Sequence, residues 1–209
     1  ILDLEATVPG PEKASARAMV RDFLVHGTGK RLWVRVNATA TGLVSADLEA
    51  IGGAGPMEGI VLPQAQTATE VREVDRLLTV MERDRGIAPG QIGLIVQLDN
   101  AKAVFFAHEL AAVSPRIASL CFGGAQDGDL ATDLGCAWSI DGPELMYARQ
   151  YALVAARASG IGCPLDGIFA NIEDNTGLLR DTELSRRFGY RGRMVIDPRQ
   201  IEPANRIYS

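Results

Sequence analysis

The chain has 209 residues, 47% of them hydrophobic, which is enough for one sizeable buried core. A formal net charge of -5 and a pI of about 5.1 argue against nucleic acid or an anionic membrane as the main partner. No apolar run approaches the ~20 residues that a membrane-spanning helix needs. The three cysteines, an odd number, suit a reducing compartment, so we expect a cytoplasmic protein.

Strand-like and helix-like segments alternate along the whole chain. Short β-rich runs bounded by Gly or Pro predict strands at residues 1–5, 31–37, 57–62, 92–98, 117–122, 166–171 and 193–196. Longer amphipathic windows predict helices at residues 11–24, 43–51, 67–85, 101–113, 142–159 and 176–188, with a short one from residue 129. Strict alternation of this kind predicts a parallel sheet covered by helices.

The number of predicted strands suggests a nearly complete barrel. Seven strands are one short of a (β/α)8 TIM barrel, and the chain begins inside a strand. We therefore predict a single barrel domain over residues 1–209 whose ends are incomplete, with the first strand–helix unit upstream of residue 1. An open doubly wound sheet is the alternative, although no GxGxxG or Walker A loop follows any predicted strand.

Two aspartates follow consecutive predicted strands. Asp99 comes directly after the fourth strand, and Asp127 comes a few residues after the fifth. The carboxyl ends of parallel strands meet at one rim, so we expect these side chains to be neighbours there. Two carboxylates with room for water and a substrate oxygen are typical of a Mg²⁺ site. The alternative is that each aspartate caps the helix that follows it.

An arginine and a pair of glycines complete the predicted rim. Arg35 lies between two valines in the second strand, where a charge needs a partner, and its planar fork suits a substrate carboxylate. A structural ion pair with Glu5 on the preceding strand is a second interpretation, compatible with the first. Gly123 and Gly124 allow the backbone to approach a ligand closely, and their N–H groups could bind an anion.

Short motifs recur in order along nearly the whole chain. They are LDLEATVP at residues 2–9, VRVN at 34–37, GIVLP at 59–63, LDNAKAV at 98–104, GAQD at 124–127 with DLG at 133–135, YAR at 147–149, DG at 166–167 and IDPRQI at 196–201. Together these motifs resemble the HpcH/HpaI aldolase and citrate lyase family, in particular its citrate lyase beta-subunit-like and malyl-CoA lyase-like members.

The resemblance implies reversible carbon–carbon bond cleavage in a trimeric or hexameric barrel. An acyl-CoA enolate and a 2-oxo acid would be the products, as in the cleavage of citryl-CoA or malyl-CoA. Mg²⁺ would be held by Asp99 and Asp127, the oxo acid by Arg35 with Asp99, Gly123 and Gly124, and Arg35 with Glu5 would be the catalytic residues. The catalytic acid of the lyases would come from a segment outside this sequence.

Departures from the family pattern bear on this expectation. Asp99 stands where Glu is usual, Ala6 replaces an acid of the LED triplet, Gln64 replaces Lys and Asp197 replaces His. The GAQDGDLATDLG segment is long, so that Asp129 is an alternative to Asp127 as the second metal ligand. The leading hypothesis is a Mg²⁺-dependent lyase of a hydroxyacyl-CoA thioester. A class II aldolase on free hydroxy-oxo acids, or a catalytically silent barrel that binds CoA or an acid, are the alternatives.

Overall fold

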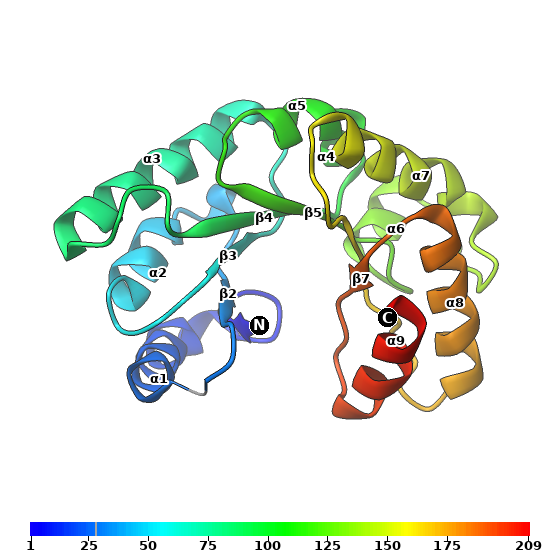
Figure 1. The fold of residues 1–209 in the computed structure, drawn as a ribbon, viewed down its shortest axis with the longest axis horizontal. Helices are drawn as coiled ribbons and strands as arrows, with labels where there is room; N and C mark the ends of the chain where they lie inside the picture. Colours follow the sequence, from blue (N-terminus) through cyan, green and yellow to red (C-terminus); the bar gives the residue numbers. More distant parts are fainter. Residues whose placement is uncertain (28) are drawn as a thin grey trace. The chain divides into compact units, whose positions relative to one another are not determined.

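The computed structural model describes residues 1–27 and 29–209, which form alternating strands and helices (Figure 1). The strand order of the parallel sheet is the chain order, from β1 to β7. The predicted parallel α/β architecture is therefore confirmed, and the eighth strand of a closed barrel stays a prediction. The chain divides into two compact units, residues 1–96 with 113–118 and residues 97–112 with 119–209.

The first unit contains three complete strands and the start of β4. Each strand pairs in parallel with the next, so that Asp3 lies opposite Arg35, and Arg35 lies opposite Val61. All four residues of β3 are buried, as expected of a parallel strand covered on both faces. The elements are β1 (Leu2–Asp3), η1 (Gly10–Glu12), α1 (Lys13–His26), β2 (Trp33–Arg35), η2 (Thr39–Thr41), α2 (Val44–Ile51), β3 (Gly59–Leu62), α3 (Ala68–Arg85) and β4 (Gly93–Leu98).

Helix α3 shows how the sequence determines an element's ends. The Thr67 hydroxyl accepts a hydrogen bond from the Glu70 N–H at 3.2 Å, and the Glu70 carboxylate accepts one from the Thr67 N–H at 2.8 Å. This reciprocal capping box satisfies two of the N–H groups that a helix start leaves without partners. Gly86 adopts a left-handed conformation at φ 67° and ends the helix.

A buried ion cluster joins α3 to the segments before β4 and β5. The Arg116 guanidinium donates two hydrogen bonds of 2.6 Å to Glu82 and one of 2.5 Å to Asp75. Glu82 also accepts hydrogen bonds from the N–H groups of Gly90 and Ile92, at 2.9 and 2.8 Å. Burial by itself would raise the pKa of Glu82, but the hydrogen bonds from Arg116 and from the two backbone N–H groups outweigh it and lower the pKa.

The second unit contains the end of β4, most of β5 and the two last strands. Cys121 of β5 lies opposite Leu165 of β6, and Asp166 of β6 lies opposite Arg193 of β7. Helix α5 packs on α7, and α8 packs on α9. The elements are α4 (Ala101–Phe105), α5 (Ala107–Ala112), β5 (Ile117–Phe122), α6 (Asp129–Leu134), α7 (Pro143–Ala158), β6 (Leu165–Asp166), α8 (Asn175–Phe188), β7 (Gly192–Arg193), η3 (Pro198–Gln200) and α9 (Ile201–Tyr208).

The structure differs from the predictions in several elements: β1, β2 and β7 are shorter than the strands expected at residues 1–5, 31–37 and 193–196, and three larger differences follow. The strand expected over residues 166–171 is only Leu165–Asp166, because side chains of Arg193 and Gln200 bind the carbonyls of Gly167 and Phe169 that a strand partner would take. The helix expected over residues 101–113 breaks at Phe106 into α4 and α5. Helix α9 was not predicted, although its proline lies in the first turn, where proline is tolerated.

Candidate active site

In the first unit, Arg35 is held by Asp3. The Nε and Nη2 atoms of Arg35 donate to the two oxygens of Asp3 at 2.7 and 2.6 Å, a bidentate geometry. The Glu5 carboxylate is 3.6 Å from Nη1, so the ion pair considered in the sequence analysis is present as the weaker of two. Sequence reasoning missed Asp3. The signal was available, because parallel pairing places Asp3 opposite Arg35.

Asp3 remains ionised over the whole physiological range. Burial by itself would raise its pKa, but the Arg35 hydrogen bonds, the Glu5 N–H and the Thr7 hydroxyl outweigh that effect and hold the pKa far below the ordinary 3.8. The Lys13 ammonium group donates to the carbonyls of Leu4 and Glu5, each at 2.7 Å, and so fixes the turn that carries both acids. A substrate carboxylate that binds Arg35 must therefore share the guanidinium with Asp3 and Glu5.

In the second unit, Asp99 lies at the carboxyl end of β4 and is 3% exposed. The backbone of Gly123 is pressed against it: a Cβ atom on Gly123 would be 2.8 Å from the Cα and Cβ atoms of Asp99. The Gly123 N–H also donates to the Leu98 carbonyl at 2.9 Å. Only glycine fits this approach, and Asp99 and Gly123 are two predicted site residues that the structure brings together.

Helix capping does not account for the two aspartates. The cap of α4 is Asn100, whose side-chain oxygen accepts from the Ala103 N–H at 2.8 Å. The residue at the start of α6 is Gly128, and no side chain caps that helix. The alternative proposed from sequence is therefore wrong for both Asp99 and Asp127. Asp99 is a buried acid at a strand end, and its Oδ1 accepts a hydrogen bond of 3.5 Å from the Asn100 side-chain amide.

Asp127 has an unusual backbone. It is exposed and adopts φ 54°, in a turn closed by a hydrogen bond of 3.1 Å from the Gly128 N–H to the Ala125 carbonyl. Gln64, two residues after β3, is the other residue besides glycine with a positive φ among those described. Such conformations cost of order 1 kcal/mol or more, and they recur at functional sites. Asp129, the alternative ligand, is exposed at the first position of α6.

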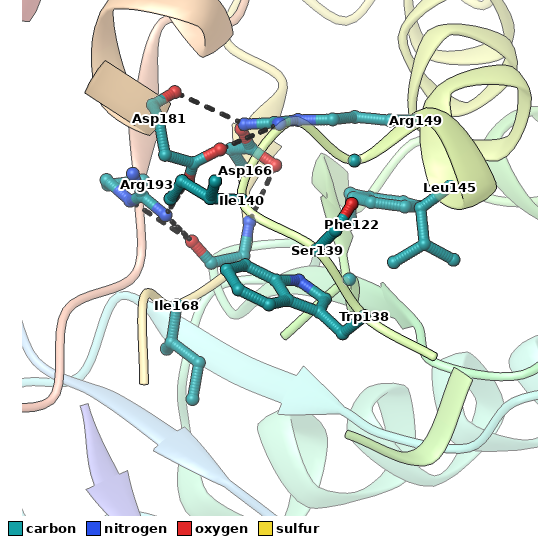
Figure 2. A pocket seen from close by; sticks show the side chains of 13 residues that line it. Phe122, Trp138, Ser139, Ile140, Leu145, Arg149, Asp166, Ile168, Asp181 and Arg193 are labelled. Atoms are coloured by element: carbon teal, nitrogen blue, oxygen red, sulfur yellow. Dashed lines mark hydrogen bonds and ion pairs between the residues drawn. The ribbon is translucent and has the colours of Figure 1, made fainter. Parts of the chain in front are cut away.

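A small cavity lies beside Gly124 in the second unit (Figure 2). Its volume of about 20 Å³ is sufficient for roughly one water molecule. Trp138, Phe122 and three aliphatic side chains contribute the apolar part of its wall, and a serine and four charged side chains contribute the polar part. These four are Arg149, Asp166, Asp181 and Arg193; Figure 2 shows the two carboxylates between the two guanidinium groups. Sequence reasoning noted Arg149 and Asp166 only as motif residues and missed the other two.

The residues of the second unit suit a divalent cation that also binds water and substrate. No three His, Cys, Asp or Glu side chains in residues 1–27 and 29–209 gather as a complete metal cage. Mg²⁺ commonly takes only one or two carboxylates from a protein and completes its coordination with water and substrate oxygens. A buried strand-end aspartate against a glycine, followed by an exposed aspartate in a strained turn, matches that pattern.

Residues 1–198 match the family described as HpcH/HpaI aldolase/citrate lyase. The chain belongs to this family. The resemblance identified in the sequence is thereby confirmed, and the citrate lyase-like protein is an enzyme of the carbon–carbon lyase class. None of the helices in the described part of the chain is both long and apolar enough to cross a membrane.

Relatives and solved structures agree with this assignment. The protein is 35% identical to the citrate lyase subunit beta of Leuconostoc mesenteroides subsp. cremoris, over 100% of this chain and 68% of that protein. It is 31% identical to a (3S)-malyl-CoA thioesterase of Cereibacter sphaeroides, over 100% and 68% of the two chains. A Mycobacterium tuberculosis citrate lyase beta subunit, solved with oxaloacetate and magnesium, superposes with a TM-score of 0.80 at 27% identity, over 99% of this chain and 84% of that one.

Proposed function

We propose that this protein is a Mg²⁺-dependent lyase that cleaves or forms a hydroxyacyl-CoA thioester of the citryl-CoA or malyl-CoA type. The observation that carries the proposal is Asp99, a buried acid that caps no helix and abuts Gly123. The similarity to the Mycobacterium tuberculosis citrate lyase beta subunit, solved with oxaloacetate and magnesium, supports it. The similarity to a citrate lyase subunit beta and to a (3S)-malyl-CoA thioesterase supports it as well. We further propose a (β/α)8 barrel with one strand more than the seven described, working in the cytoplasm as a homotrimer or hexamer.

Asp99 and Asp127 would hold the metal, with Asp129 as the alternative to Asp127. When bound, Mg²⁺ supplies Lewis-acid stabilisation of the negative charge that develops on an enolate or carbonyl oxygen. Asp99 reaches about one methylene less far than the glutamate usual in the family, so we expect a site with more room for water. Gly123 keeps Asp99 in place, and Gly124 lies in the same turn, where it would contact the bound acid.

Arg35 and Glu5 would serve the organic substrate. We propose that Arg35 binds the carboxylate of the oxo acid, while Asp3 orients the guanidinium through its two hydrogen bonds. In the cleavage direction Glu5, 3.6 Å from Arg35, would accept the proton of the substrate hydroxyl as the carbon–carbon bond breaks. The bonding electrons then form the acyl-CoA enolate, and a proton delivered to its carbon completes the reaction.

Product analysis tests the reaction. Purified protein with Mg²⁺ and malyl-CoA should release acetyl-CoA and glyoxylate, and with citryl-CoA acetyl-CoA and oxaloacetate. Release of the free hydroxy acid and CoA would instead identify a thioesterase, a second candidate supported by the Cereibacter sphaeroides relative. Cleavage of free 4-hydroxy-2-oxo acids would favour the aldolase alternative. Ligand binding in calorimetry without any bond cleavage would indicate a silent barrel.

Calorimetric titration with Mg²⁺ tests the metal ligands separately. Asp99→Asn and Asp127→Asn should each abolish measurable Mg²⁺ binding while the melting temperature stays near that of the wild type. Asp129→Asn is the matched control, because Asp129 lies two residues after Asp127 and is also exposed. If Asp129→Asn loses the metal and Asp127→Asn keeps it, the alternative ligand is correct. Wild-type affinity in both the Asp99 and Asp127 variants would overturn the proposed site.

A further inference from the structure

A quartet of charged side chains lines the small cavity beside Gly124, in the unit that also contains Asp99 and Asp127. We define the charged quartet as Arg149 of α7, Asp166 of β6, Asp181 of α8 and Arg193 of β7 (Figure 2). Arg149 donates to Asp166 at 3.0 Å and to Asp181 at 2.9 Å, and Arg193 donates to Asp181 at 2.8 Å. The four side chains are 2–11% exposed, and their charges cancel.

Stability alone is a weak reason for such an arrangement. Removing two carboxylates and two guanidinium groups from water costs several kcal/mol per ion, and well-packed apolar residues often do as well or better. Buried networks with every member satisfied are better known for fixing one local structure. The question for the charged quartet is therefore which part of the backbone it holds.

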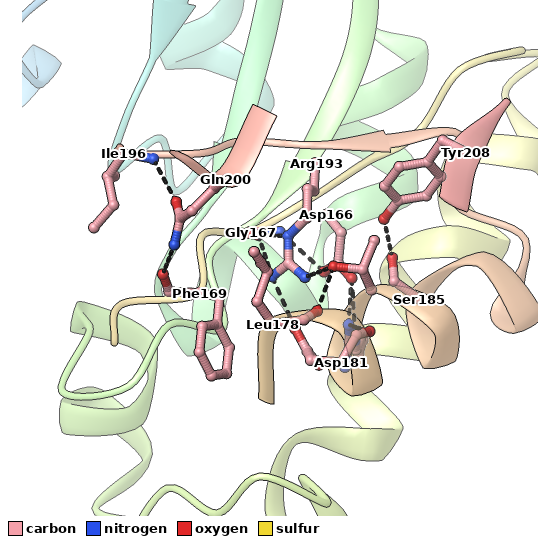
Figure 3. Close-up of polar contacts among 12 residues, drawn as sticks. Asp166, Gly167, Phe169, Leu178, Asp181, Ser185, Arg193, Ile196, Gln200 and Tyr208 are labelled. Atoms are coloured by element: carbon pink, nitrogen blue, oxygen red, sulfur yellow. Dashed lines mark hydrogen bonds and ion pairs between the residues drawn. The ribbon is translucent and has the colours of Figure 1, made fainter. Parts of the chain in front are cut away.

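The charged quartet converges on the peptide groups of Gly167. Asp166 accepts a hydrogen bond from the Gly167 N–H at 2.9 Å. Arg193 donates to the Gly167 carbonyl through Nε at 3.2 Å and Nη2 at 2.9 Å, as Figure 3 shows. Both polar groups of one glycine are thus bound by side chains of the quartet, and this is also why β6 ends at Asp166.

Gly167 is in turn packed against the end of β5. A Cβ atom on Gly167 would stand 2.4 Å from the Phe122 carbonyl oxygen and 3.3 Å from the Gly124 nitrogen. The residue between those two, Gly123, has the equivalent close contact with Asp99 at 2.8 Å. The backbone approach of Gly167 to Phe122 and Gly124 leaves no room for a side chain between them, so the two segments are coupled there although the cavity of about 20 Å³ borders the same residues. A continuous path of contacts runs from the charged quartet through Gly167 to the turn that carries Asp127, and through Gly123 of that turn to Asp99.

We propose that the charged quartet is a positioning device: through Gly167 it sets the backbone of residues 123–127 and so tunes the affinity of the metal site. The proposal rests on the proposed function for its metal readout only. The four members of the charged quartet are positioning residues, since none of them is proposed to touch metal or substrate. Partners that orient metal ligands from behind typically change metal affinity 10–100-fold when they are replaced.

Arg193→Lys is the principal test. Lysine keeps the charge that faces Asp181 but has no planar fork with which to hold the Gly167 carbonyl. We expect the Mg²⁺ dissociation constant to rise about tenfold, and the amide resonances of Gly124 and Asp127 to shift in the metal-free protein. Asp181→Asn should do the same to a smaller extent. The control is Ser185→Ala, which removes a part-buried hydrogen bond of 2.6 Å with Tyr208; Ser185 lies on α8, as Asp181 does, but outside the quartet.

The two readouts separate this proposal from the proposed function. Wild-type metal affinity and wild-type amide resonances in both quartet variants would overturn the positioning role, even in an active lyase. If the wild type binds no Mg²⁺, the proposed function fails, and the amide resonances alone decide the positioning role. If the quartet variants do not fold, Gly167→Ala compared with Gly162→Ala decides by the same criteria, because a Cβ on Gly162 meets nothing within 4 Å.

Discussion

Glu82 offers the sharpest test of what stabilises the first unit. Its carboxylate, 1% exposed, accepts four hydrogen bonds, two from the Arg116 guanidinium and two from backbone N–H groups. Glu82→Ala removes all four hydrogen bonds at once. It leaves Arg116, 6% exposed, with Asp75 as its remaining carboxylate. It also leaves the Ile92 N–H buried without its acceptor, and removes the acceptor of the N–H of Gly90, an exposed residue.

The expected loss of stability is about 4 to 5 kcal/mol. Breaking a buried pair from one side costs roughly 3–5 kcal/mol, because an uncompensated charge stays behind. The stranded Ile92 N–H costs about 1–3 kcal/mol, and this contribution overlaps with the first because all four hydrogen bonds end on one carboxylate. With an m-value of about 2 kcal/mol/M, the urea midpoint should fall by roughly 2 M. Few single substitutions act so strongly.

Urea unfolding followed by circular dichroism measures this loss. Glu73→Ala on the same helix is the control; it removes an exposed ion pair with Arg76 and should leave the midpoint unchanged. The double variant Glu82→Leu/Arg116→Met should be more stable than either Glu82→Ala or Arg116→Met alone, because it removes both charges together. A midpoint shift below about 0.5 M for Glu82→Ala would refute the reasoning. So would a double variant whose loss of stability equals the sum of the losses in Glu82→Ala and Arg116→Met.

Three further predictions concern other residues. The folded-state pKa of Asp3 lies below its ordinary 3.8, so the stability that Asp3 contributes is present above that value and is lost as the pH falls. In Asp3→Asn the urea midpoint should therefore fall less steeply between about pH 5 and pH 2 than in the wild type. The same slope in both proteins would contradict this. Gly123→Ala should abolish Mg²⁺ binding in calorimetry, because the new Cβ displaces Asp99; wild-type affinity would show that the contact relaxes without consequence. Thr67→Ala should cost about 1 kcal/mol in urea unfolding through loss of the capping box, and Thr67→Ser should restore most of it.

Much of the fold is readable from local sequence patterns. The strand at residues 117–122 and the long helix from residue 68 to residue 85 were predicted to within a residue, because hydrophobic period, caps and terminating glycines agree there. The strand expected at residues 166–171 was mistaken because its carbonyls bind the side chains of Arg193 and Gln200, which are distant in sequence. No local pattern contains that information.

The candidate site was predictable only where local sequence is sufficient. A polar residue directly after a predicted strand, such as Asp99, is visible in the sequence. Identifying the partner of Arg35 requires the register between β1 and β2, which places Asp3 opposite Arg35. The charged quartet required four segments to meet, and its members read individually as ordinary helix or strand residues.

The left-handed backbone at Asp127 limits how this position can vary in evolution. Glycine, asparagine and aspartate are the residues that accept such a conformation readily, and only aspartate brings a negative charge. A lineage could therefore pass from Asp to Asn or Gly here with little change in folding or melting temperature. If Asp127 holds the metal as proposed, loss of metal binding in a descendant would leave almost no trace in its architecture, so a homologue that binds the metal and one that does not could differ by one amide.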